Sequence, residues 1–198
     1  MSAAGTLRLM VVIASTRPGR VGLPVGEWVV GRAKAHGGFE VDLVDLAELG
    51  LPFMDEPNHP RLKHYTQPHT WEWSARVEPA DAFVFVIPEY NHGINAPLKN
   101  ALDFLYREWA HKPAGIVAYG GISAGSRSAE MLRVALLGLR VVPIFDGVYI
   151  PFVHQALDDG CFQGDEGQER AAAAMFGELA RYARALRVLR EPAPGGGA

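Results

Sequence analysis

The chain has 198 residues, of which 48% are hydrophobic and 21% are charged, and its formal net charge at pH 7 is −3. This length fits a single domain that can bury a core without disulfides, and we expect residues 1–191 to form it. The weak negative charge and the lack of a basic run argue against a nucleic-acid partner. Cys161 is the only cysteine and no apolar run is long enough for a membrane span. We therefore expect a cytoplasmic protein without a membrane partner.

The first half of the chain alternates short apolar runs with amphipathic stretches. Residues 9–14 are continuously apolar, which predicts a buried strand. After a loop, Pro24 suits the first turn of a helix, and glycines at 37–38 predict its end. Residues 39–46 alternate apolar and acidic side chains and predict a second strand. The stretch 51–67 is rich in proline, histidine and charge, and we expect a long surface loop of unassigned role.

The second half of the chain continues the same alternation of strands and helices. In chain order we expect a helix at 70–78, a strand at 82–87, a helix at 97–109, a strand at 115–119, a helix at 126–139, a strand at 141–145 and a helix at 169–189. Residues 192–198 are rich in proline and glycine and predict a disordered tail.

Five strands that alternate with helices predict an α/β fold with a parallel sheet covered on both faces. The pattern fits a flavodoxin-like sheet as well as half of a dinucleotide-binding fold. In either case ligands bind beyond the carboxyl ends of the strands, so the loops that follow the strands are the candidate site.

The first such loop, residues 15–22, combines hydroxyls, glycines and two arginines before a helix. Backbone N–H groups, the helix dipole and guanidinium groups all favour an anion there. The dinucleotide pattern G-x-G-x-x-G and the nucleoside-triphosphatase loop are both absent, so a terminal monophosphate is the better hypothesis. A solvated turn with scattered arginines is the alternative interpretation.

Two further loops follow the third and fourth predicted strands. Residues 88–93 place a proline, an aromatic and an amide together, which suits the edge of a heteroaromatic ring; a turn whose Tyr90 simply packs is the alternative. Residues 119–125 contain adjacent glycines, which let backbone approach a ligand closely. An ordinary strand-to-helix loop is the alternative for this segment.

Taken together, the segments 14–22, 88–91, 97–103 and 119–121 resemble the NADPH-dependent FMN reductase family in residue types and in order. The resemblance runs from the first strand to the helix that ends near residue 139. It implies a flavodoxin-like three-layer sandwich with strand order 2-1-3-4-5 and a flavin mononucleotide (FMN) held without a covalent bond.

The resemblance also implies a set of cofactor-binding residues. The phosphate would be held by Ser15, Arg17, Arg20, Val21 and Gly22. The isoalloxazine ring would be bordered by Pro88, Glu89, Tyr90 and Asn91, and its other edge would be flanked by Tyr119, Gly120 and Gly121. Many family members have glycine where Ala14 stands, and a second serine in the phosphate loop where this chain has Arg20 and Val21.

We therefore expect an FMN-dependent oxidoreductase that passes electrons from NADPH or NADH to a small acceptor, such as a quinone, a flavin, an azo compound or a metal oxyanion. The alternatives are a flavodoxin-type electron carrier with a protein partner and a flavin-free regulatory module. The family resemblance, together with Phe104 and Tyr106 beside the leucine face of helix 97–109, predicts a homodimer or homotetramer.

Overall fold

The computed structural model describes residues 5–190, whose main feature is one sheet of five parallel strands. The strands are β1 (Leu7–Ile13), β2 (Phe39–Asp45), β3 (Ala82–Pro88), β4 (Pro113–Tyr119) and β5 (Val142–Ile150). Their order across the sheet is β2-β1-β3-β4-β5, which confirms the predicted flavodoxin-like order. The predicted tail at 192–198 lies outside the described residues.

The strand registers bring the carboxyl ends of all five strands to one edge of the sheet. Ile13 at the end of β1 lies opposite Asp45 in β2. Tyr119 at the end of β4 lies opposite Pro88 in β3 and Ile150 in β5. Because the strands are parallel, every loop that follows a strand begins at this edge.

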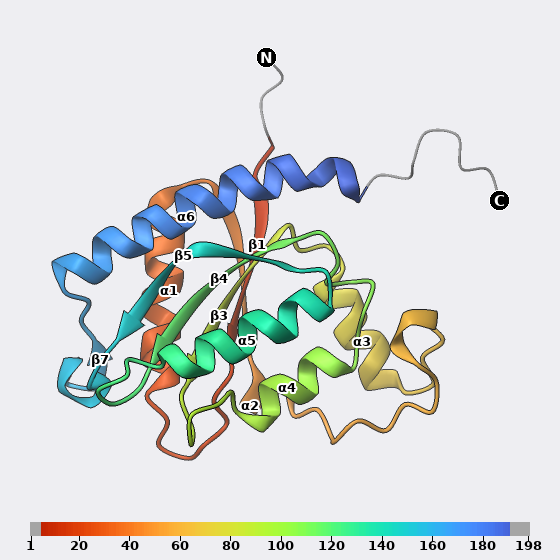
Figure 1. Cartoon of the computed structure of the whole chain (residues 1–198), viewed down its shortest axis with the longest axis horizontal. Helices are drawn as coiled ribbons and strands as arrows, with labels where there is room; N and C mark the ends of the chain where they lie inside the picture. Colours follow the sequence, from red (N-terminus) through yellow and green to blue (C-terminus); the bar gives the residue numbers. More distant parts are fainter. Residues whose placement is uncertain (1–4, 191–198) are drawn as a thin grey trace.

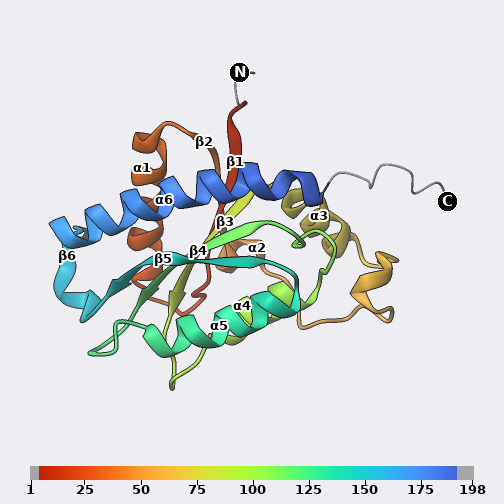
Figure 2. The same cartoon turned by 45° about the horizontal axis from the view of Figure 1, so that its top comes forward.

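Helices cover both faces of the sheet and make a three-layer sandwich (Figure 1; Figure 2). One face carries α1 (Gly22–His36) and α6 (Glu166–Leu186); the other carries α3 (Pro68–Val77), α4 (Ala96–Asp103) and α5 (Ser126–Gly138). The shorter elements are α2 (Leu46–Leu49), η1 (Pro60–Leu62), η2 (Val153–Ala156), η3 (Arg187–Leu189) and a hairpin of β6 (Leu157–Asp158) and β7 (Cys161–Phe162). Within residues 5–190, none of the helices combines the length and apolar character that a membrane crossing requires.

Side chains of the central strands alternate between two hydrophobic cores, one under each helical layer. Leu9 and Val84 point toward α1 and α6, where they pack in one cluster with Phe176. Met10 and Phe85 point the other way and belong to the cluster under α3, α4 and α5. Burial on both faces explains why the central strands read as continuous apolar runs in the sequence.

The helix predicted at 97–109 is wrong in its second half, because α4 ends at Asp103. The backbone N–H of Tyr106 donates to the carboxylate of Glu108 at 3.3 Å instead of to a helical carbonyl. The carbonyl of Leu102, which would accept that bond in a continuing helix, accepts from the indole Nε1 of Trp109 at 3.2 Å. Side-chain hydrogen bonds therefore replace the next helical turn.

The predicted end of the last strand is also wrong, because β5 continues to Ile150 rather than stopping at Phe145. The register shifts by two residues between the pairs Ala114–Pro143 and Ile116–Gly147, so β5 contains a bulge. A Cβ at Gly147 would lie 2.8 Å from the carbonyl oxygen of Ile116, which explains the glycine at this position.

Because α4 ends at Asp103, Phe104 and Tyr106 do not lie on an apolar helix face that could bind a second copy of the chain. Phe104 is fully buried in the chain's own core, and the ring of Tyr106 packs under the guanidinium of Arg61. Neither side chain offers the free apolar face that the sequence predicted.

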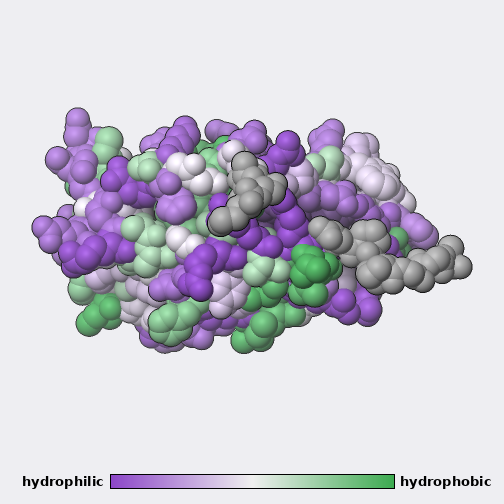
Figure 3. All heavy atoms as spheres, turned by 90° about the horizontal axis from the view of Figure 1, so that it is seen from above, coloured by the Kyte–Doolittle hydropathy of each residue, from purple (hydrophilic) through white to green (hydrophobic). Residues whose placement is uncertain are grey.

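An exposed apolar patch lies instead on α5 and the neighbouring strand β5. It consists of Met131, Val134, Leu137 and Phe145, which are 51%, 72%, 64% and 91% exposed. Figure 3, which looks down on the face that carries α6, shows mostly hydrophilic side chains there, whereas hydrophobic ones gather along the lower edge, on the side of α5. We call these four residues the α5 patch.

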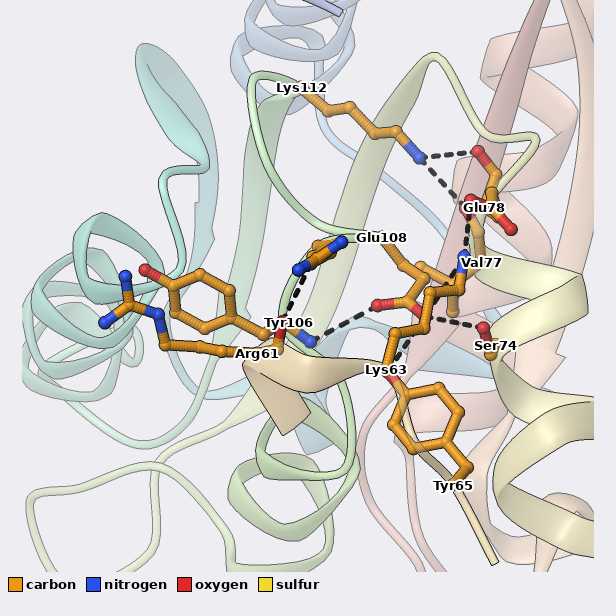
Figure 4. A network of polar contacts seen from close by, with 10 residues as sticks. Arg61, Lys63, Tyr65, Ser74, Val77, Glu78, Tyr106, Glu108 and Lys112 are labelled. Atoms are coloured by element: carbon orange, nitrogen blue, oxygen red, sulfur yellow. Dashed lines mark hydrogen bonds and ion pairs between the residues drawn. The ribbon is translucent and has the colours of Figure 1, made fainter. Parts of the chain in front are cut away.

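The long loop at 51–67 contains only the short helix η1, as expected, but it is tied firmly to the rest of the domain. The buried carboxylate of Glu108 accepts hydrogen bonds from the hydroxyls of Tyr65 at 2.9 Å and Ser74 at 2.6 Å (Figure 4). Lys63 Nζ lies 3.7 Å from the same carboxylate. Glu108 thus joins the loop, α3 and the segment before β4.

Candidate active site

A cavity of about 430 Å³ lies at the carboxyl edge of the sheet. It is lined by the loops that follow β1, β3, β4 and β5, through residues Arg17, Pro18, Gly19, Arg20, Val21, Pro88, Glu89, Tyr90, Tyr119, Gly120, Gly121, Phe152, Val153, His154 and Gln155. The structure therefore brings nine of the twelve predicted cofactor residues into one wall. The other three, Ser15, Gly22 and Asn91, lie next to this wall in the sequence.

The first loop turns tightly before it enters α1. The N–H of Arg20 donates to the carbonyl of Arg17 at 3.1 Å, and Gly19 has a φ of +69° that favours glycine. The side chain of Arg17 is exposed and makes no hydrogen bond or ion pair with another described residue. Arg20 instead forms an ion pair with Asp45 at the end of β2. Arg17 is the guanidinium that remains available for an anion.

Ser15, at the start of the first loop, contacts Tyr90 of the second loop. The hydroxyl of Tyr90 lies 2.7 Å from Oγ of the buried Ser15 and joins the first loop to the second. A Cβ at Gly22 would lie 2.5 Å from Oη of Tyr119, so a larger residue at the start of α1 would force the buried tyrosine side chain to shift.

Three buried polar atoms near this edge lack a hydrogen-bond partner within residues 5–190. They are Nε of Arg20, Oδ1 of Asn95 and Oη of Tyr119. Asn95 also donates from Nδ2 to the carbonyl of Ala14 at 2.5 Å, which places its side chain at the end of β1. Since buried polar groups are normally paired, these orphans fit a ligand that carries hydroxyl and phosphate oxygens.

The second loop is a two-residue hairpin. Tyr90 and Gly93 exchange backbone hydrogen bonds of 3.1 and 3.0 Å. Asn91 and His92 between them have φ values of 49° and 69°, which is the left-handed pair of a type I′ turn. Asn91 tolerates this conformation well and is exposed at the tip.

Glu89 holds the third loop against the second. Its carboxylate accepts hydrogen bonds from Ser123 Oγ at 2.8 Å and from the backbone N and side-chain Nε of Arg127 at 3.0 and 2.8 Å. Burial alone would raise the pKa of Glu89, but these donors hold the pKa below its ordinary value. The side chain thus acts between loops, a role that the sequence did not indicate.

The third loop packs tightly through its glycines. A Cβ at Gly120 would lie 3.3 Å from the backbone N of Gly125, which itself has a φ of +78°. Gly121 has open space where its Cβ would stand, so this stretch of backbone is free to face a ligand.

Sequence reasoning missed the fourth loop, residues 152–155. The N–H of Phe152 donates to the carbonyl of Gly121 at 3.1 Å and the N–H of Val153 donates to that of Gly120 at 3.2 Å. Phe152 is 48% exposed in the cavity wall. The continuous apolar run at residues 148–150 was the available signal, but the predicted strand stopped before it.

Comparison with known proteins places this arrangement in a family. The model of the NADPH-dependent FMN reductase family matches residues 7–155, which include all four loops. The chain belongs to the NADPH-dependent FMN reductase family. It is therefore an FMN-dependent oxidoreductase that uses NAD(P)H, and the carrier and flavin-free alternatives are set aside.

Individual relatives agree with this assignment. An NAD(P)H-dependent FMN reductase of Schizosaccharomyces pombe is 40% identical over 149 residues, which cover 74% of each chain. One from Nectria sp. is 34% identical over 181 residues, covering 84% of this chain and 88% of the relative. A solved flavoenzyme, the NAD(P)H:(acceptor) oxidoreductase FerB of Paracoccus denitrificans, has a TM-score of 0.72 at 20% identity and covers 91% of this chain and 98% of its own. That likeness concerns the fold alone.

Proposed function

We propose that FMN binds in the cavity at the carboxyl edge, with its phosphate at residues 15–22. The observation that carries this proposal is the exposed guanidinium of Arg17 beside a helix N-terminus, in a cavity that is also lined by Arg20 and Tyr119, each with a buried polar atom that lacks a partner within residues 5–190. Arg17 and the N–H groups of the loop would hold the phosphate, with Ser15, Val21 and Gly22 shaping the turn. Arg20 would contribute from its fixed position against Asp45.

The isoalloxazine ring would lie between the second and third loops. Pro88, Glu89, Tyr90 and Asn91 would supply backbone along one edge, and Tyr119, Gly120 and Gly121 would supply it along the other. Phe152 would add an apolar wall. When bound, FMN supplies the redox chemistry, and the protein binds it, orients it and excludes water. No side chain in the cavity needs to act as a general acid or base.

The acceptor is proposed to be a small molecule, with quinones as the first class to test. A quinone oxidoreductase of Solanum tuberosum is 40% identical over 100 residues, which cover 48% of this chain and 49% of the relative. We expect the loops to cover one face of the bound ring and leave the other open, so nicotinamide and acceptor would use that face in turn. Reacting atoms must come within about 3–3.5 Å, which only direct stacking provides.

An absorption spectrum of the purified protein, followed by anaerobic addition of NADPH, tests the proposal. We expect a bound flavin that NADPH bleaches and a quinone reoxidises, with parallel double-reciprocal plots. Titration of the apo-protein should show tighter binding of FMN than of riboflavin, because only FMN carries the phosphate. Equal affinities would contradict the phosphate loop, and intersecting plots would contradict the shared face.

We also propose a homodimer or homotetramer that assembles through the α5 patch. Three of its apolar side chains lie on α5 and Phe145 lies on the edge strand β5, and all four are at least half exposed, which is typical of an interaction surface. Light scattering at micromolar concentration should give a mass above 21.5 kDa, and Val134→Glu should lower it to that of the monomer. A wild-type mass near 21.5 kDa would contradict assembly.

Two broader proposals concern the chain as a whole. We propose that residues 1–191 fold as a single domain, which predicts one cooperative unfolding transition. We also propose a cytoplasmic location, because the free Cys161 is exposed and suits a reducing compartment.

A further inference from the structure

The carboxylate of Glu89 lies between the two loops proposed to hold the flavin ring. Its backbone belongs to the cavity wall, and its N–H donates to the carbonyl of Tyr119 at 3.1 Å. Its side chain is only 7% exposed and turns toward the first turn of α5, where Arg127 lies. The carboxylate therefore contacts protein groups on the side of α5.

Both carboxylate oxygens are engaged. Oε1 accepts from Ser123 Oγ and from Arg127 Nε, each at 2.8 Å. Oε2 accepts from the backbone N–H of Arg127 at 3.0 Å, in the first turn of α5, where the helix dipole also favours a negative charge. Charge-assisted hydrogen bonds of this kind are roughly twice as strong as neutral ones.

Arg127 extends the contact to the second loop. Its Nη1 donates to Nε2 of His92 at 3.0 Å, and His92 occupies the hairpin tip with a left-handed φ of 69°. A non-glycine residue holds that conformation only where its surroundings fix it. Glu89 and Arg127 thus tie the end of β3, the hairpin and the third loop to one helix.

We propose that Glu89 is a positioning residue, which through Ser123 and Arg127 fixes the spacing between the two loops that receive the flavin ring. This inference rests on the proposed flavin site. Loops held at the right spacing before binding lose less conformational entropy when the ring enters. Removing the carboxylate charge should therefore weaken binding of the ring and leave the phosphate loop unchanged.

Riboflavin separates the ring from the phosphate, because it has the same ring and no phosphate group. We would titrate apo-protein with FMN and with riboflavin, for the wild type, Glu89→Gln and the matched control Glu130→Gln. Glu130 also pairs with an arginine on α5, Arg133 at 3.5 Å, but lies outside the cavity. For Glu89→Gln we expect Kd to rise about tenfold for both flavins. For Glu130→Gln we expect no change.

The midpoint potential of bound FMN gives a second readout that a general loss of stability would not move. A changed spacing between the second and third loops alters the relative affinity for oxidised and reduced flavin. Glu89→Gln should therefore shift the midpoint potential, and Glu130→Gln should not. If Glu89→Gln does not fold, Ser123→Ala removes a single donor from the same carboxylate and should raise both Kd values about threefold.

The possible outcomes distinguish the positioning role of Glu89 from the flavin site itself. A wild-type protein that binds neither flavin would overturn the proposed site. Wild-type binding that Glu89→Gln matches for both flavins would overturn the positioning role alone. A loss confined to FMN, with riboflavin unchanged, would also overturn it, since the effect would then lie at the phosphate.

Discussion

The hydroxyl of Tyr90 lies 2.7 Å from Oγ of Ser15, and this contact joins the loop after β3 to the loop after β1 across 75 positions of sequence. Ser15 is fully buried, whereas Tyr90 is 37% exposed in the cavity wall. The two loops are the ones to which we assign the flavin ring and its phosphate. A single hydrogen bond therefore connects the two ends of the proposed site.

Replacing Tyr90 with phenylalanine should destabilise the apo-protein by about 1 kcal/mol, because the buried Ser15 hydroxyl loses its partner. Urea unfolding would measure the change. Tyr182→Phe is the matched control, since Tyr182 is 40% exposed on α6 and its hydroxyl makes no hydrogen bond with another described residue. A Tyr90→Phe variant as stable as the wild type would show that the contact contributes nothing.

Two glycines of α1 should respond to alanine in opposite directions. At Gly31 a Cβ meets nothing within 4 Å, so Gly31→Ala should stabilise the protein by roughly 0.5–1 kcal/mol through helix propensity. At Gly22 the Cβ would lie 2.5 Å from Tyr119 Oη, so Gly22→Ala should destabilise it. Adding Tyr119→Phe to Gly22→Ala should restore part of the loss. Thermal unfolding of these three variants against the wild type checks the direction of each effect, and stabilisation by Gly22→Ala would refute the close contact.

The two arginines of the first loop should have separable effects. Arg17→Ala should weaken FMN binding by about 1.5–3 kcal/mol with little change in stability, because Arg17 is exposed and has no partner among the described residues. Arg20→Ala should destabilise the fold by about 3 kcal/mol, since it leaves the buried carboxylate of Asp45 unpaired.

Asp45→Asn on the Arg20→Ala background removes the unpaired charge and should recover much of the lost stability. Isothermal titration with FMN and urea unfolding of each variant give the two readouts. If Arg17→Ala lowered stability and left FMN affinity intact, the assigned roles would be reversed.

Much of the fold could be predicted because local pattern and final burial agree in the central strands. Residues 82–87 are uniformly apolar and become fully buried. The alternation with helices predicts a parallel sheet, but its strand order was implied by the family resemblance. The error at 97–109 has a non-local cause. The sequence pattern continues past Asp103, but Glu108 captures the N–H of Tyr106, and Glu108 is held there by Tyr65 and Ser74. No local pattern reports those partners.

For the candidate site, the positions of most loops could be predicted from the sequence, but the roles of individual side chains could not. Residue types and chain order located three of the four loops that line the cavity, because glycines, hydroxyls and arginines after a strand are visible in the local sequence. The side-chain roles of Glu89 and Arg20 were not predictable, since their partners lie 38 and 25 positions away, at Arg127 and Asp45. Composition indicates a charge in a loop but not whether it faces a ligand or another loop.

Lys112 provides a prediction about pH that is independent of the flavin. Lys112 is only 4% exposed. Its Nζ donates to the carbonyls of Val77 at 3.1 Å and Glu78 at 2.7 Å, at the end of α3 (Figure 4). Burial, with a smaller contribution from the charge of Arg190, lowers the pKa of Lys112 from 10.5 to about 7.

The direction of this pH dependence follows from the number of protons that Lys112 binds in the folded and in the unfolded state. Between pH 7 and 10.5 the unfolded lysine keeps its proton while the folded one loses it, so the unfolded state binds more protons. The free energy of unfolding contributed by Lys112 therefore rises with pH across this window, by at most about 1.4 kcal/mol per pH unit. Below pH 7 both states are protonated and the contribution is constant and unfavourable, because the charge is buried.

Lys112→Met should remove this dependence, since methionine fills a similar volume and does not titrate. The difference in unfolding free energy between wild type and Lys112→Met should grow in favour of the wild type from pH 7 to 10, measured by urea unfolding at each pH. Subtracting the variant cancels the tyrosines, which titrate near the same range. Lys99→Met is the control, because Lys99 pairs with Asp103 on the exposed face of α4 and is 49% exposed. Parallel pH profiles for wild type and Lys112→Met would show that the buried amine keeps an ordinary pKa, and that hydrogen bonds to the end of α3 offset the cost of burying its charge.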